Sequence, residues 1–168
     1  LLPRHGREAD IVWCDVDPCY VFHPCNAYET EGGDVVMDVC AHDTMFAEST
    51  QGPDSHRVPF ERWTIDPRAR RVSRHVIDAD GQEFPRLNEA LTGKSYRYAY
   101  TMALPDGFDG ANPTQTRLYK HDLFAGTRSV HDFGPGRVPG EFVFVAKAPA
   151  RAEDDGWLIG YVVDTNTQ

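Results

Sequence analysis

The sequence predicts an all-β protein in which short antiparallel strands follow one another as hairpins. Its apolar runs are short, rich in valine, isoleucine, phenylalanine, tyrosine and tryptophan, and bounded by glycine, proline, aspartate or asparagine, a pattern typical of strands joined by tight turns. No segment carries the period of a long helix. The expected strands are, in chain order, Ile11–Val16, Cys19–His23, Asp34–Cys40, Arg62–Asp66, Arg71–Ile77, Tyr96–Leu104, Arg117–Asp122, Thr127–Phe133, Glu141–Ala146 and Gly156–Asp164.

Turn chemistry and alternation support these strands. Cys19–His23 ends at Pro24 and an asparagine-containing bend, so His23 is expected at the rim of a sheet, in a turn. The glycines of ETEGGDVV supply a hairpin turn before Asp34–Cys40, and DLFAGT does the same between two later strands. In Tyr96–Leu104, tyrosines alternate with other residues, which is the two-residue period of a strand.

A repeat organises the chain. RWTIDPRARRVSRH, from Arg62, and RLYKHDLFAGTRSVH, from Arg117, share one plan: a strand, an aspartate near its end, a short turn, and a strand that ends near a histidine. The segments that follow, GQEFP and PGEFVF, each place Glu-Phe after a glycine-containing turn at the start of a strand. Glu83 and Glu141 are 58 residues apart, and 60 residues before Glu83 stands His23.

This spacing favours a β-propeller over a sandwich or a barrel. In a propeller each repeat is a four-stranded blade, and equivalent positions of successive blades surround the central axis. The interval exceeds the usual blade of roughly 40–50 residues, so inserted loops are needed. We therefore expect one domain over residues 1–168, in which His23, Glu83 and Glu141 converge near an axis.

Composition sets limits on function. The chain has 168 residues, of which 40% are hydrophobic, enough for a globular core. A net charge of −9 argues against a nucleic-acid partner, because an acidic surface repels phosphates. The sequence shows neither a membrane-spanning run nor a signal peptide, so we expect a cytoplasmic protein and leave a peripheral membrane contact open. Reduced thiols, rather than a structural zinc site, are expected at Cys14, Cys19, Cys25 and Cys40.

Eight segments in order, CYVFHPCNAYE, DVVMDVCAH, ERWTID, QEFPRLNE, YRYAY, LYKHDL, PGEFVFVAKAP and EDDGWLIGYVVD, resemble the carotenoid cleavage oxygenase family, most of all its bacterial members. That family also includes the retinal pigment epithelium isomerase and the lignostilbene dioxygenases. The resemblance covers nearly the whole chain. It implies a seven-bladed β-propeller with a non-haem Fe(II) on its axis, held by four histidines. It also implies a dioxygenase that uses O₂ to split a double bond of an apolar polyene or stilbene-type substrate into two carbonyl products.

The resemblance assigns roles to three residues. His23 matches the third iron-ligating histidine, and Glu83 and Glu141 match two glutamates that hydrogen-bond such histidines; no catalytic residue beyond the metal site is implied. The fourth histidine, in a GFHG-like motif, is expected after Gln168, and the first two histidines and the first glutamate before Leu1. The chain is therefore expected to be a fragment of about three blades, truncated at both ends, with one iron ligand of four and no activity of its own.

Two other functions stay open at this point. A non-catalytic propeller could serve as a binding module, and a calcium-dependent propeller hydrolase or lactonase would need carboxylate, asparagine and carbonyl ligands. The three residues could instead have purely structural roles. His23 could be a rim histidine bonded to a backbone carbonyl, and Glu83 and Glu141 could cap turns or pair with Arg86 and Arg137.

The remaining histidines and several aromatic residues have weaker claims. We expect His42 to be an exposed loop residue, although it could line a cavity. We expect His75 and His131 to face solvent, and no role for His5, His56 or His121. Four aromatic residues are core residues by default and could instead border a substrate tunnel: Phe22, Phe84, Phe142 and Phe144.

Overall fold

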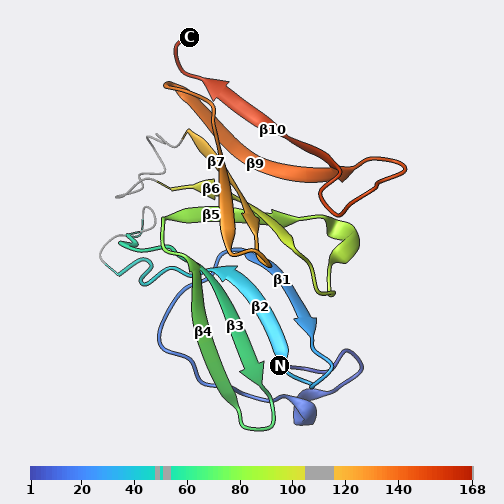
Figure 1. Cartoon of the computed structure of the whole chain (residues 1–168). Helices are drawn as coiled ribbons and strands as arrows, with labels where there is room; N and C mark the ends of the chain where they lie inside the picture. Colours follow the sequence, from blue (N-terminus) through green and yellow to red (C-terminus); the bar gives the residue numbers. More distant parts are fainter. Residues whose placement is uncertain (48–49, 51–53, 105–115, 168) are drawn as a thin grey trace.

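The computed structural model describes residues 1–47, 50, 54–104 and 116–167, and these residues form three antiparallel sheets (Figure 1). Helical structure in this part of the chain is confined to two short 3₁₀ turns, Glu8–Asp10 and Glu89–Leu91. No helix of the described residues is long and apolar enough to cross a membrane.

The first two sheets are four-stranded meanders in which each strand pairs with the next one along the chain. The third sheet is a hairpin of two long strands. The strands of the three sheets are β1 (Pro24–Glu29), β2 (Val35–Cys40), β3 (Phe60–Asp66) and β4 (Arg71–Asp78); β5 (Gln82–Leu87), β6 (Tyr98–Ala103), β7 (Arg117–Asp122) and β8 (Thr127–Asp132); and β9 (Arg137–Ala146) and β10 (Gly156–Asp164).

The repeated aspartates close equivalent turns. Asp66 Oδ1 accepts the backbone N–H groups of the residues two and three positions later, both at 2.9 Å, in the β3–β4 turn. Asp122 Oδ1 does the same in the β7–β8 turn, at 3.2 and 3.1 Å. An aspartate side chain that accepts from the backbone ahead of it stabilises a tight turn. In the β1–β2 turn, Gly33 has φ +83°, which glycine adopts without steric cost. The hairpins predicted at these turns are confirmed.

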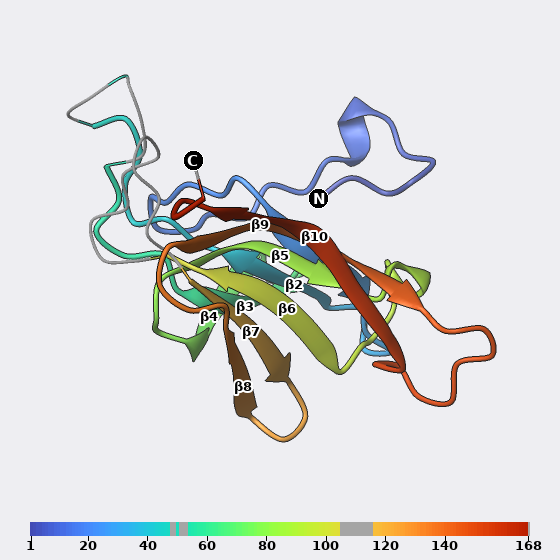
Figure 2. The same cartoon turned by 90° about the horizontal axis from the view of Figure 1, so that it is seen from above.

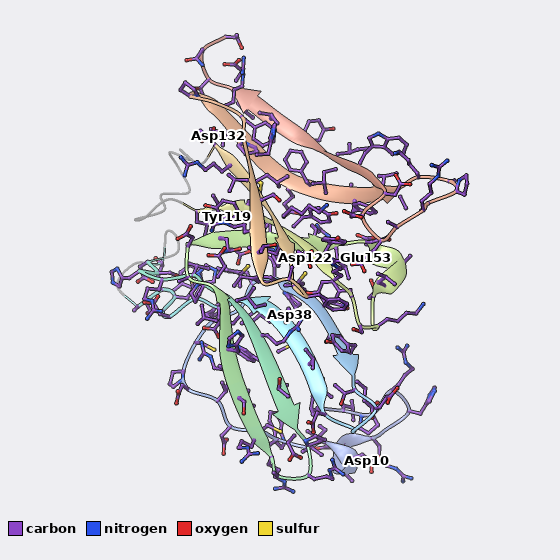
Figure 3. The ribbon with its side chains drawn as sticks, viewed as in Figure 1. Asp10, Asp38, Tyr119, Asp122, Asp132 and Glu153 are labelled. Atoms are coloured by element: carbon purple, nitrogen blue, oxygen red, sulfur yellow. The ribbon has the colours of Figure 1, made fainter. Side chains whose placement is uncertain are left out.

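The three sheets follow one another along the molecule, and the first strand of each contacts the neighbouring sheet (Figures 1 and 2). β5 packs against β1 and β2 on one side and against β9 on the other. The core between the first two sheets includes Phe60, Leu87 and Tyr96. The core between the second and third includes Met102, Leu118 and Phe142. Residues at the starts of β1, β5 and β9 therefore lie in neighbouring layers.

Two of the differences from the expected strands coincide with prolines. Cys19–His23 is not a strand; it contributes one isolated bridge, between Tyr20 and His42. The strand begins instead at Pro24, a position where a missing N–H is tolerated. β5 was not among the ten listed strands, although the Glu-Phe pair of GQEFP was expected at a strand start; a break in the β5–β6 register between Glu83 and Arg86 accommodates Pro85. Ile11–Val16 likewise forms only an isolated bridge, between Asp15 and Arg71.

Candidate metal-binding site

His23 stands directly before β1 and is held by a carboxylate from β5. Its Nδ1 lies 2.8 Å from Glu83 Oε2. An ionised carboxylate can only accept a hydrogen bond, so we assign the ring proton to Nδ1, which leaves the Nε2 lone pair free. No described residue forms a hydrogen bond to Nε2, and the side chain is 45% exposed. In this tautomer the ring presents the Nε2 lone pair to open space, as a metal ligand must.

Glu83 is buried and is oriented by a bulge in β5. The next residue, Phe84, has φ +53°, a left-handed conformation that is a genuine outlier for a bulky side chain. Its N–H donates to Glu83 Oε2 at 2.6 Å. Bulges re-aim side chains next to functional sites, and a strained residue of this kind costs of order 1–3 kcal/mol. The local backbone is therefore bent so that the carboxylate faces His23.

Glu83 has a second imidazole partner. His42, just past the end of β2, has Nε2 2.9 Å from Glu83 Oε1. Its Nδ1 lies 2.7 Å from Ser55 Oγ, and the residue is only 2% exposed. The expectation of an exposed loop histidine is wrong. A backbone bridge to Tyr20 continues the pairing just past β2 and holds His42 in the interior.

Glu141 lies near His23 but is bonded to an arginine. Its Oε2 accepts a hydrogen bond from Arg86 Nη2 at 2.8 Å, and its side chain is 45% exposed. No described histidine contacts it. This pairing with Arg86 is the structural role that the sequence left open for Glu141. A role for Glu141 toward an iron-ligating histidine therefore stays a prediction. Both Glu141 and His23 line one small cavity of about 90 Å³, together with Pro24, Phe84, Pro85 and Arg86.

Aromatic side chains surround the exposed imidazole. The Phe84 ring centroid is 5.2 Å from that of His23, and the Phe22 ring is 6.2 Å from it. Tyr20 and Phe46 extend this surface, with rings 4.8 Å from Phe22 and 6.4 Å from Tyr20 respectively. We refer to Tyr20, Phe22, Phe46 and Phe84 as the aromatic rim. It offers apolar surface that reaches the His23 ring through Phe22 and Phe84.

The other two aromatic candidates are packing residues. Phe142 is buried in the core between the second and third sheets. Phe144 is partly buried and stacks on Tyr100, with ring centroids 5.6 Å apart. Neither contacts the His23 ring, so only Phe22 and Phe84 of the four candidates belong to the site.

A second buried histidine lies outside the site. His121, on β7, is 2% exposed. Its Nε2 lies 2.8 Å from Gln82 Oε1 and 3.1 Å from Thr101 Oγ1. Burial lowers the pKa of His121 to about 4, because desolvation outweighs the attraction of Asp78. We expected no role for His121 from the sequence. Its burial could have been inferred from its position two residues after the buried Tyr119, on the same face of β7. His75 and His131 are exposed, as expected.

In the described part of the chain, the candidate metal ligand is a single imidazole, that of His23. Within the described ranges, no group of three or more histidine, cysteine, aspartate or glutamate side chains is arranged to hold a metal ion. Two of the four thiols, those of Cys25 and Cys40, are buried, and burial raises the pKa of Cys25 to about 12. His23 fits the role of one neutral ligand, since imidazole suits Fe(II) and a carboxylate on its other nitrogen fixes the tautomer.

Comparison with known proteins places the chain among characterised relatives. It matches the family described as retinal pigment epithelial membrane protein over residues 1–168. It is 42% identical over 167 residues to the carotenoid cleavage oxygenase of Mycobacterium tuberculosis, covering 96% of this chain and 33% of that protein. It is 34% identical to the apocarotenoid-15,15'-oxygenase of Synechocystis, covering 95% of this chain and 33% of that protein.

Solved structures agree with these matches. The chain superposes on cobalt-substituted Synechocystis ACO with a TM-score of 0.78 at 29% identity, covering 91% of this chain and 33% of that one. An ACO/RPE65 chimera gives a TM-score of 0.79 at 29% identity, with the same coverage. The predicted partial β-propeller is confirmed. The chain spans about a third of the length of the relatives that it matches.

Proposed function

Because the chain belongs to the retinal pigment epithelial membrane protein family, we propose that it forms part of a non-haem Fe(II)-dependent dioxygenase. The proposed enzyme cleaves a carbon–carbon double bond of a carotenoid, apocarotenoid or stilbene-type substrate into two carbonyl products. The relatives at 42% and 34% identity are named as carotenoid and apocarotenoid oxygenases. The observation that carries the proposal is His23, whose Nδ1 is held by Glu83 and whose Nε2 is free.

His23 is the residue of this chain that would hold the iron. The remaining ligands would come from the rest of the full-length protein, since the chain spans a third of its relatives. The Synechocystis enzyme has been solved in a cobalt-substituted form, which supports a metal centre in that relative. When bound, iron(II) would supply the binding and activation of O₂.

The chain's own residues would prepare the site. Glu83 keeps the proton of His23 on Nδ1 and increases the basicity of Nε2. The buried carboxylate, with its two imidazole partners and the Phe84 N–H, holds this geometry before any ligand arrives. The aromatic rim excludes water from one side of the imidazole and offers a surface on which an apolar polyene can pack. We extend the proposal to a cytoplasmic enzyme with a peripheral membrane contact, from which such a substrate could be drawn.

The geometry favours this function over a calcium-dependent hydrolase. Calcium prefers several free oxygen ligands. Glu83 is already engaged by two imidazoles and a backbone N–H, and Glu141 is engaged by Arg86. A purely structural binding module, in turn, would have no need of the strained Phe84 backbone that aims Glu83 at His23.

The test uses the full-length protein that contains this chain. His23→Ala should lower bound iron at least tenfold after purification and abolish cleavage of an apocarotenal, with iron measured by plasma mass spectrometry. His75→Ala is the matched control, because His75 is an exposed histidine on β4. Unchanged iron and unchanged turnover in His23→Ala would refute the assignment.

A further inference from the structure

We infer that His42 is a positioning residue of the metal site, which fixes Glu83 and through it the ring of His23. The inference rests on the proposed function, because it concerns the histidine that would bind the metal. Three contacts carry it: those of His42 with Glu83, with Ser55 and with the backbone of Tyr20.

The first step concerns the carboxylate. Glu83 Oε2 accepts from His23 Nδ1 and from the Phe84 N–H, while Oε1 accepts from His42 Nε2. If all donors lay on one oxygen, the carboxylate plane could turn about the Cγ–Cδ bond of Glu83, because rotation about this terminal torsion is only weakly restricted. A donor on the second oxygen fixes that plane. The direction of the hydrogen bond to His23, and so the orientation of its ring, then depends on His42.

The second step concerns His42 itself, which is held firmly. Its backbone N–H donates to the Tyr20 carbonyl at 2.8 Å and its carbonyl accepts from the Tyr20 N–H at 2.9 Å. Its ring packs edge-on against Phe22 at 5.2 Å. Because Tyr20 and Phe22 directly precede His23, His42 contacts the segment that carries the candidate ligand as well as the carboxylate that orients it.

The third step separates positioning from ligation. Both ring nitrogens of His42 are engaged, one by Glu83 and the other by Ser55. The ring is buried, whereas the ring of His23 is open. His42 therefore has no free nitrogen for a metal.

The experiment compares two amides that differ by one methylene group, in the full-length protein. The side-chain nitrogen of His42→Gln can reach the place of Nε2 and keep the bond to Glu83. His42→Asn reaches only the place of Nδ1, so it keeps a partner for Ser55 and loses the bond to Glu83. Cobalt(II) is the probe: its affinity is measured by competition with a chelator, and its coordination by the visible absorption spectrum.

We expect His42→Asn to weaken cobalt binding about tenfold to a hundredfold, as the loss of an outer-sphere partner typically does, and to alter the spectrum. His42→Gln should retain most of the affinity. Equal weakening in both variants, or wild-type binding in His42→Asn, would overturn the inference. Should His42→Asn not fold, His42→Phe takes its place, since it keeps the contact with Phe22. If neither folds while His42→Gln does, His42 supports the fold rather than the site, and the inference is wrong.

His23→Ala, measured in the same assay, separates the two proposals. Weaker cobalt binding in His23→Ala together with wild-type binding in His42→Asn would refute only the role of His42. Unchanged binding in His23→Ala would refute the proposed function itself.

Discussion

Acid should destabilise the protein through His121, a buried histidine that takes no part in the proposed site. Its Nε2 donates to Gln82 Oε1, which also accepts from the Thr101 hydroxyl at 2.8 Å. Its Nδ1 is 3.8 Å from Asp78 Oδ2. The charged groups that act on it are Asp78, which favours the imidazolium, and Arg128, which opposes it. Burial dominates, so the neutral ring is the folded form.

The magnitude follows from the difference between the two states. The pKa of His121 is about 4 in the folded protein and 6.5 in the unfolded chain. Between these values the unfolded chain binds a proton that the folded protein does not, so the free energy of unfolding falls as the pH falls. At 1.36 kcal/mol for each pKa unit, the loss reaches roughly 3 kcal/mol near pH 4. Above pH 6.5 the contribution is fully present.

The assay is urea unfolding at a series of pH values between 7 and 4, compared with His121→Gln. Glutamine can donate to Gln82 in the same way but does not titrate. The variant should therefore lack roughly 3 kcal/mol of the wild-type pH dependence, while other titrating groups affect both proteins equally. Parallel curves for the two proteins would refute the reasoning.

Two further predictions concern the neighbours of His23. Phe84→Gly should be about 1 kcal/mol more stable to urea than Phe84→Ala, because a left-handed residue penalises any side chain by roughly 1–2 kcal/mol; the opposite order would show that φ +53° is not strained. Glu141→Gln should change the free energy of unfolding by less than about 1 kcal/mol, since its pair with Arg86 is exposed. If Glu141 also supports a histidine of the full-length protein, Glu141→Gln should weaken iron binding while the apparent stability stays constant, and unchanged iron would exclude that role.

Local chemistry made much of the fold predictable from the sequence. Asp66, Asp122 and Gly33 close hairpins through interactions within a few residues, so their signals are present in short segments. The start of β1 and the extent of β5 could not be predicted in this way. Pro24 and Pro85 look like interruptions, and only pairing with neighbouring strands and a bulge makes them compatible with a sheet.

The site was predictable where it follows the repeat and hidden where it depends on packing. The interval from His23 to Glu83 indicated that the two would meet, and they form a hydrogen bond. The bond from His42 to Glu83 joins residues 41 positions apart in no repeated relation. It exists because the bridge to Tyr20 draws a loop segment into the interior. Glu141 has the expected spacing, yet Arg86 lies within reach and takes its carboxylate.

The most direct test of the central claim is a crystal structure of the full-length protein loaded with iron or cobalt, with the metal located by anomalous diffraction. The account predicts a metal at roughly 2.0–2.1 Å from His23 Nε2, the distance at which imidazole binds zinc, with Nδ1 still bonded to Glu83. A metal that binds elsewhere, or that displaces Glu83 from Nδ1, would contradict it.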